Sequence, residues 1–178
     1  QYSYALNSPI CLSDESGQLT VIVPGTWNDQ YQWKNSNFRK QIEKTFGEKA
    51  IVLDNPDMAN SDLARRAAAQ KLVSLINTAA KRGEKINIIA HSHGGNVVAI
   101  ATRSGELKHR VNLVVNMNRP VRGDYDTNMK AVDRIINAYS QHDAVQVYGG
   151  SCSDDRGPMR AYLACNAGRG SIAGRTSL

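Results

Sequence analysis

Ser92 is the residue in this sequence whose surroundings best suit chemistry. It follows the β-favouring run at 86–90 and precedes small residues and an apolar helical pattern. That order predicts a strand, a sharp turn and a helix, with the serine at the apex. A turn this tight strains the serine backbone and leaves room only for small neighbours two positions away, and these are Ala90 and Gly94. It exposes the hydroxyl as a nucleophile and places the backbone N–H of His93 at a helix N-terminus, where it can hold an oxyanion.

This pattern resembles the nucleophile elbow, G-x-S-x-G, of the α/β-hydrolases, with Ala90 in the first glycine position as in some bacterial lipases. A second segment, Pro24-Gly25-Thr26, follows the β-branched run at 19–23 and resembles the turn that supplies the family's other oxyanion donor. Proline stands there in the histidine position, and the resemblance implies that Thr26 donates the second N–H. The alternative for both segments is an ordinary turn between a strand and a helix.

Asp143 is the candidate triad acid. It follows a strand expected at 134–140, in a segment, Tyr-Ser-Gln-His-Asp-Ala-Val, that resembles the acid loop of lipases and acyl-protein esterases. The family order then requires a histidine after the acid, and none follows Asp143 here. We expect the natural chain to continue past Leu178 to a last strand and a histidine loop. The alternatives are His142 as a substitute base, and a hydrolase fold retained only for binding.

The three other histidines are poor candidates for the base. His91 and His93 flank the nucleophile, and an elbow of the usual shape points both away from it. His109 precedes a strand and is expected at the opposite end of the sheet.

Strands and helices alternate along most of the chain. The patterns predict strands at 19–23, 50–53, 86–90, 111–116 and 134–140, and helices at 35–46, at 62–82 and after Ser92. This order is typical of a parallel sheet with right-handed crossovers. We therefore expect an α/β-hydrolase-like three-layer sandwich with a mostly parallel sheet. Trp27, Tyr31 and Trp33 either line an acyl pocket or cover the sheet edge.

The first residues have a different character. Residues 1–17 resemble the last segment of the RHS-repeat core, Y-x-Y-x-x-N-x-P-[IV] followed by D-P-x-G. The matching positions are Tyr2, Tyr4, Asn7, Pro9, Ile10, Asp14 and Gly17, and Glu15 replaces the proline. The resemblance implies a boundary, with 1–17 ending an RHS-like shell and 18–178 forming the toxin domain of a polymorphic bacterial effector, often with cleavage at the junction after Gly17. The alternative is a turn-rich tail.

Composition and charge restrict the kinds of partner, metal site and membrane segment that this chain can have. The chain has 178 residues, a formal charge of +6, no long apolar run and no signal peptide at its start. The basic residues are dispersed, and they favour anionic partners such as phospholipid head groups. Three cysteines without C-x-x-C spacing argue against zinc. Cys152 and Cys165 either pair as a disulfide or remain thiols, and Cys11 is left over.

The elbow pattern predicts a serine esterase with a Ser-His-Asp mechanism. The resemblances to the hydrolases and to the RHS-repeat core imply a lipase or phospholipase that acts as a secreted antibacterial effector. Ser92 and Asp143 would be catalytic, Thr26 and His93 would hold the oxyanion, and no metal or cofactor is required. The expected partners are a lipid or other ester substrate, the RHS shell and an acidic immunity protein over Ser92. We expect no nucleic-acid partner, because no motif for one is present. The alternatives are an inactive binding domain, which would use its charge to contact nucleic acid, and a thioesterase or peptidase on the same scaffold.

Overall fold

The fold is organised around one parallel sheet. A computed structural model describes residues 17–25, 30–54, 61–120 and 125–139. The strands are β1 (Gln18–Val23), β2 (Ala50–Val52), β3 (Lys85–His91), β4 (Val111–Met117) and β5 (Val132–Ala138), in the spatial order β2-β1-β3-β4-β5. Every neighbouring pair runs parallel, so the sheet in this part of the chain is wholly parallel.

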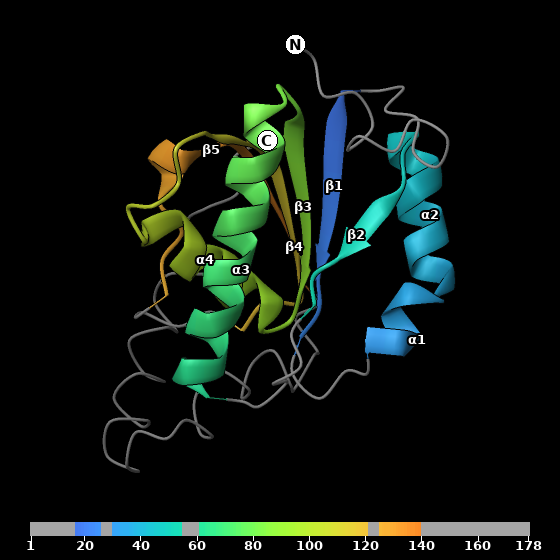
Figure 1. The fold of residues 1–178 in the computed structure, drawn as a ribbon. Coiled ribbons are helices and arrows are strands. Elements are labelled where there is room, and N and C mark those ends of the chain that lie inside the picture. Colours follow the sequence, from blue (N-terminus) through green and yellow to red (C-terminus); the bar gives the residue numbers. More distant parts are fainter. Residues whose placement is uncertain (1–16, 26–29, 55–60, 121–124, 140–178) are drawn as a thin grey trace.

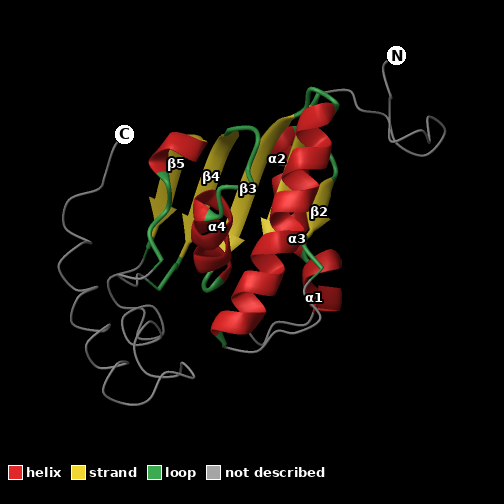
Figure 2. Cartoon of the chain, turned by 60° about the vertical axis from the view of Figure 1, so that its left-hand side comes forward, coloured by secondary structure: helices red, strands yellow, loops and turns green. Residues whose placement is uncertain are grey.

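Helices cover both faces of the sheet. They are α1 (Gln30–Lys34), α2 (Asn37–Phe46), α3 (Asp62–Lys81) and α4 (Gly94–Arg103), and a short 3₁₀ turn, η2 (Met129–Ala131), precedes β5. The helices α1 and α2 lie on one face, and α3 and α4 lie side by side on the other (Figures 1 and 2). The described residues therefore form a three-layer α/β structure, as predicted, because each parallel connection must return across a face.

The helix predicted at 35–46 is α2, which begins at Asn37 and not at Asn35, and α1 at Gln30–Lys34 was not predicted. Ser36 has extended backbone angles, φ −72° and ψ 149°, and its side chain accepts a hydrogen bond from the Arg39 N–H at 3.0 Å. A serine in this geometry is an N-cap, so α2 begins after it and α1 ends before it. The end of α2 agrees with the prediction, since Gly47 is left-handed with φ 73°.

The long helix α3 has the predicted caps but a different buried face. Ser61 caps its N-terminus by accepting from the Ala64 N–H at 3.1 Å, and Gly83 follows its end with φ 80°. Leu63 was expected in the apolar stripe, yet 74% of it is exposed. The helix packs against both the sheet and α4, and the face that it buries there is rich in small residues. Its buried residues are Ala64, Arg65, Ala68, Ala69, Leu72, Val73, Ile76 and Ala79.

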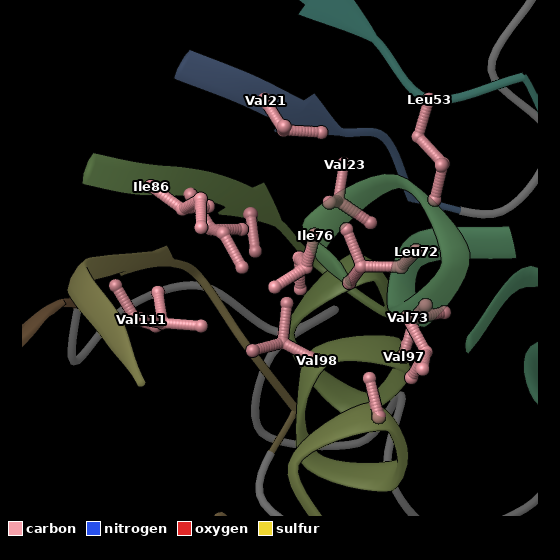
Figure 3. Close-up of a cluster of buried hydrophobic side chains, with 14 of the residues drawn as sticks. Val21, Val23, Leu53, Leu72, Val73, Ile76, Ile86, Val97, Val98 and Val111 are labelled. Atoms are coloured by element: carbon pink, nitrogen blue, oxygen red, sulfur yellow. The ribbon is translucent and has the colours of Figure 1, made fainter. Parts of the chain in front are cut away.

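The main core lies between the sheet and the helices α3 and α4. Leu72 and Ile76 of α3 meet Val98 of α4 over Val23 and Ile86 (Figure 3). Each of these five side chains is at most 1% exposed. Full burial of side chains this size stabilises a fold by about 1.5–3 kcal/mol each. This core fixes β1, β3 and the elbow helix α4 relative to one another.

A smaller core occupies the other face of the sheet. Ile22 and Ile89 form its floor, and Trp33 and Phe38 pack on it. The rings of Trp33 and Phe38 meet edge to face, with centroids 5.5 Å apart. Trp33 thus covers the sheet, whereas 72% of Tyr31 is exposed. Trp27 lies outside the described residues.

Candidate functional site

The carboxyl ends of β1, β3 and β4 bring three turns together at one rim of the sheet. Strand register pairs Val23 with Ala90, and His91 with Met117. The residues that follow these strands are therefore neighbours. The strand order 2-1-3-4-5 reverses direction between β1 and β3. In open α/β sheets this switch point is the usual place for a ligand, and Ser92 follows the strand on one side of it.

Ser92 sits at the apex of the turn between β3 and α4 in a strained conformation. Its φ of 51° lies in the left-handed region, which a residue with a side chain adopts at a cost. The turn is held on both sides. The Ser92 N–H donates to the Met117 carbonyl at 2.8 Å, and the Gly95 N–H donates to the Ser92 carbonyl at 3.0 Å. Such a strained serine between a strand and a helix matches the elbow that the sequence predicts.

Two glycines allow the β1 turn to lie directly against the elbow. A Cβ at Gly94 would lie 2.2 Å from the Val23 carbonyl oxygen, closer than real Cβ atoms come. A Cβ at Gly25 would lie 2.9 Å from Cβ of Ser92 and 3.4 Å from its Oγ. Both positions therefore need glycine for close approach. The structure brings Gly25 and Ser92 together, as predicted for the two segments that resemble hydrolase turns.

One of the two predicted oxyanion donors can be located. His93 is the N-cap of α4, with φ −59° and ψ −16°, so its backbone N–H belongs to the N-terminus of that helix. The helix dipole places partial positive charge there, which favours an anion. Thr26, the other predicted donor, lies outside the described residues, directly after Gly25.

The described histidines lie in three different surroundings. The ring of His91 lies against Trp33, with centroids 5.4 Å apart, on the face covered by α1 and α2. Nδ1 of His93, whose residue is 6% exposed, lies 3.3 Å from the Asn96 amide nitrogen. His109 is exposed and lies before β4, at the opposite rim. The structure therefore assigns none of these three described histidines as the base for Ser92.

The predicted acid, Asp143, and the substitute base, His142, both lie outside the described residues. The strand that leads to them is in place at the same rim. β5 ends at Ala138, whose carbonyl accepts from the Asn118 N–H at 2.8 Å. Asn118 is left-handed, with φ 49°, a conformation that asparagine tolerates well. The Cys152–Cys165 pair, Cys11 and residues 1–16 are likewise outside the described part of the chain.

The sequence analysis did not single out Arg119, a half-buried arginine next to the elbow. The side chain of Arg119 covers Gly95, whose added Cβ would lie 2.6 Å from Cδ of the arginine. Its Nε donates to Oδ1 of Asn96 at 2.9 Å, Nη1 donates to the Thr127 hydroxyl at 3.0 Å, and Nη2 donates to the Tyr125 carbonyl. Burial lowers the pKa of Arg119 to about 10, against an opposing effect of the Asp126 charge. The only signal in the sequence was its place just after a predicted strand.

The polar contacts continue from Arg119 to the start of α3. The Tyr125 hydroxyl donates to Oδ1 of Asp62 at 2.5 Å and accepts from Nε of Arg65 at 3.1 Å. The Arg65 guanidinium also lies over the Tyr125 ring, 5.2 Å from its centroid. Arg65 is 2% exposed, so these contacts compensate a buried charge. The elbow helix is thereby tied to α3.

Two kinds of feature are absent from the described residues. No group of three His, Cys, Asp or Glu side chains in those ranges is arranged to hold a metal ion. Among the described helices, none combines the length and apolar character needed to cross a membrane.

No protein-family model matches this chain, and no curated protein matches it either. The geometry therefore carries the functional proposal. It supplies a strained serine, a helix N-terminus beside it and a glycine turn packed against its side chain.

Proposed function

We propose that this protein is a serine hydrolase of carboxylic esters with Ser92 as its nucleophile. The observation that carries the proposal is the positive φ of Ser92, 51°, at a turn closed by Gly94 and Gly25. Strain of this kind is tolerated where a nucleophile must be held exposed above a sheet. A turn that only joined a strand to a helix would not require it.

The mechanism follows from the arrangement at the rim. The Ser92 hydroxyl attacks the ester carbonyl, and a histidine accepts its proton. The carbonyl oxygen becomes an oxyanion, which the His93 N–H and the Thr26 N–H would stabilise. The leaving alcohol takes the proton from the histidine. Water then attacks the carbonyl of the acyl-enzyme and gives a proton to the histidine. The bond to Ser92 breaks, the serine oxygen takes that proton back, and the carboxylic acid is released. Asp143 would orient the histidine and stabilise its charged form.

The α/β-hydrolase fold is the scaffold that this mechanism suits. The wholly parallel order β2-β1-β3-β4-β5, with helices on both faces, also occurs in other doubly wound proteins. What favours the hydrolase fold is the elbow, together with a glycine turn from the neighbouring strand β1 at the nucleophile.

The substrate we propose is a lipid ester, and the setting is that of a delivered bacterial toxin. The charge of +6 favours contact with phospholipid head groups, and the start of the chain resembles the end of an RHS shell. Gly17 lies at the opposite end of β1 from Gly25, and its carbonyl accepts from the Lys85 N–H at 2.9 Å. A shell joined there would leave the Ser92 rim accessible to a membrane, or to an acidic immunity protein.

Labelling with a fluorophosphonate probe tests the proposal. We expect a covalent adduct at Ser92, located by mass spectrometry and lost in Ser92→Ala. Asp143→Asn should slow labelling by roughly a hundredfold or more if that carboxylate orients the base. His142→Ala then asks whether the base is His142. The same variants are assayed on phospholipid, thioester and peptide substrates to identify the bond that is cleaved.

The proposal fails if Ser92 is not labelled either in this chain or in the longest natural protein that contains it. An inactive binding domain predicts that result. A domain that contacts nucleic acid through its charge predicts binding that weakens steeply with salt and survives Ser92→Ala.

A further inference from the structure

Arg119 occupies an electrostatically costly position. Its side chain lies over Gly95 and bonds to Asn96, so it contacts the first turn of α4. Positive charge is ordinarily disfavoured at a helix N-terminus, where the dipole is already positive, and partial removal from water adds a further cost. Both the helix and the arginine thus create positive potential in the region where Ser92 is held strained.

The hydrogen bonds of Arg119 also fix the residue that would bind the oxyanion. Because Nε donates to Oδ1 of Asn96, the amide nitrogen of Asn96 is left to face Nδ1 of His93, at 3.3 Å. An amide donor there makes Nδ1 the acceptor of this contact. Asn96 is fully buried and His93 nearly so. The chain of contacts from Arg119 through Asn96 therefore orients His93, whose backbone N–H begins the helix.

Two further groups bonded to the guanidinium are neutral. They are the Thr127 hydroxyl and the Tyr125 carbonyl, and the charge of Asp126 also acts on Arg119. Asp126 is exposed to water, which screens it. Further charged side chains among the described residues here are Asp62 and Arg65, both bonded to the Tyr125 hydroxyl, and Arg66, which pairs with Asp62.

We propose that Arg119 is the positioning residue of the elbow, which locks the first turn of α4 and provides a fixed positive charge that favours an anion at Ser92. In the proposed reaction, that anion is the oxyanion and the developing alkoxide. Preorganised charge in a water-poor site stabilises such groups more than charge in water does. The inference rests on the proposed hydrolase function and extends it, but it can be tested without any hydrolysis.

The thiol pKa of a Ser92→Cys variant measures the potential directly. A thiolate is an anion at the position of the serine oxygen, and a positive environment lowers its pKa below the ordinary value of about 8.5. The pKa is read from the pH dependence of alkylation by iodoacetamide, with the peptide that carries the introduced thiol quantified by mass spectrometry. The natural cysteines are followed in the same samples as internal references.

In the Ser92→Cys background, Arg119→Met removes the charge and should raise the pKa of the introduced thiol by about one, as expected when a nearby charge is removed from a partly buried site. Arg119→Lys keeps the charge and should restore most of the difference. Thr127→Ala loses one hydrogen bond but no charge, and should leave the pKa nearly unchanged. Arg103→Met is the matched control, because it removes an exposed arginine in the last turn of the same helix.

Arg119→Gln provides a second neutral variant if Arg119→Met does not fold, which circular dichroism and thermal melting would reveal. A Ser92→Cys parent whose introduced thiol has a pKa at or above the ordinary value overturns the proposal. So does an equal effect of Arg119→Met and Arg103→Met, or an Arg119→Lys variant that behaves like the neutral ones. A depressed thiol pKa that depends on Arg119, in a protein that no fluorophosphonate labels, would support this inference while contradicting the proposed hydrolysis.

Discussion

At the scale of single residues, the site depends on backbone geometry more than on reactive side chains. Ser92 is strained, and Gly94 and Gly25 permit backbones to approach where any Cβ would collide. The atoms that a Cβ at Gly94 would meet are backbone atoms of Val23 and Pro24, which cannot rotate away. Ser92 is thus held by close packing of the β1 turn, β3 and α4.

Gly94→Ala should destabilise the protein by about 2 kcal/mol or more, because the new methyl group overlaps a buried carbonyl. It should also slow fluorophosphonate labelling at least roughly tenfold, since β1 and the elbow must separate. Urea unfolding and labelling rates measure the two effects.

Gly47→Ala is the matched control for that change. Gly47 has φ 73° and open space around it, so the substitution should cost only about 1 kcal/mol of backbone strain. It should leave labelling unchanged. Equal effects of the two substitutions on both measurements would show that the elbow does not depend on close packing at Gly94.

At the scale of elements, the start of α3 is tied to the elbow helix by polar contacts. Asp62 bonds to Tyr125, whose carbonyl accepts from Arg119, which in turn bonds to Asn96 of α4. Desolvation raises the pKa of Asp62, but hydrogen bonds from Tyr125 and Arg66 and the charges of Arg66 and Arg65 outweigh it. The pKa of Asp62 is therefore lowered overall.

This lowered pKa predicts acid sensitivity. A carboxylate whose folded pKa is below its unfolded value stabilises the fold at neutral pH, and that contribution is lost as pH falls through the folded pKa. Asp62→Asn should therefore flatten the decrease in unfolding free energy between about pH 5 and about pH 2. Urea midpoints across that range provide the measurement.

Tyr125→Phe removes one of the donors to Asp62 and should flatten the same decrease only in part. If Asp62→Asn and the unchanged protein lose stability in parallel, the contact between α3 and Tyr125 does not operate in solution.

At the scale of the whole molecule, the parallel sheet separates two ends with different roles. The rim at the carboxyl ends of the strands holds Ser92, Gly25 and Arg119, while Gly17 enters the sheet at the other end. The three layers place α1 and α2 on one face and α3 and α4 on the other (Figure 2). The proposed substrate would thus approach the rim along the strand direction.

The net charge predicts a salt-dependent attraction to anionic membranes. We expect binding to vesicles that contain anionic phospholipid, little binding to zwitterionic vesicles, and weakening between about 50 and about 300 mM salt as charges are screened. Vesicle co-sedimentation measures it. Ser92→Ala should bind the vesicles as well as the unchanged protein does, yet hydrolyse no ester. If that variant loses vesicle binding as well as hydrolysis, the membrane-binding surface includes Ser92.

Much of the fold could be predicted from the sequence, because local patterns follow local physics. The runs of β-branched residues, the caps at Ser61 and Gly47, and the small residues around Ser92 each act over a few positions, and each is found in its predicted role. The predicted start of α2 was wrong because the Ser36 cap competes with a continuous helical pattern. Leu63 was wrongly expected in the core because periodicity does not say which neighbours a helix meets.

The sequence by itself determined the strand–turn–helix at Ser92 and the alternation that makes a parallel sheet. Only the tertiary structure decided which separate segments meet at Ser92. Gly25 lies against Ser92 because β1 and β3 pair in one register. Arg119 covers the first turn of α4 because β4 ends at the same rim. The physical reason is that close approach and burial depend on contacts between residues far apart in the chain. The composition and periodicity of one segment do not specify which distant segment it will contact.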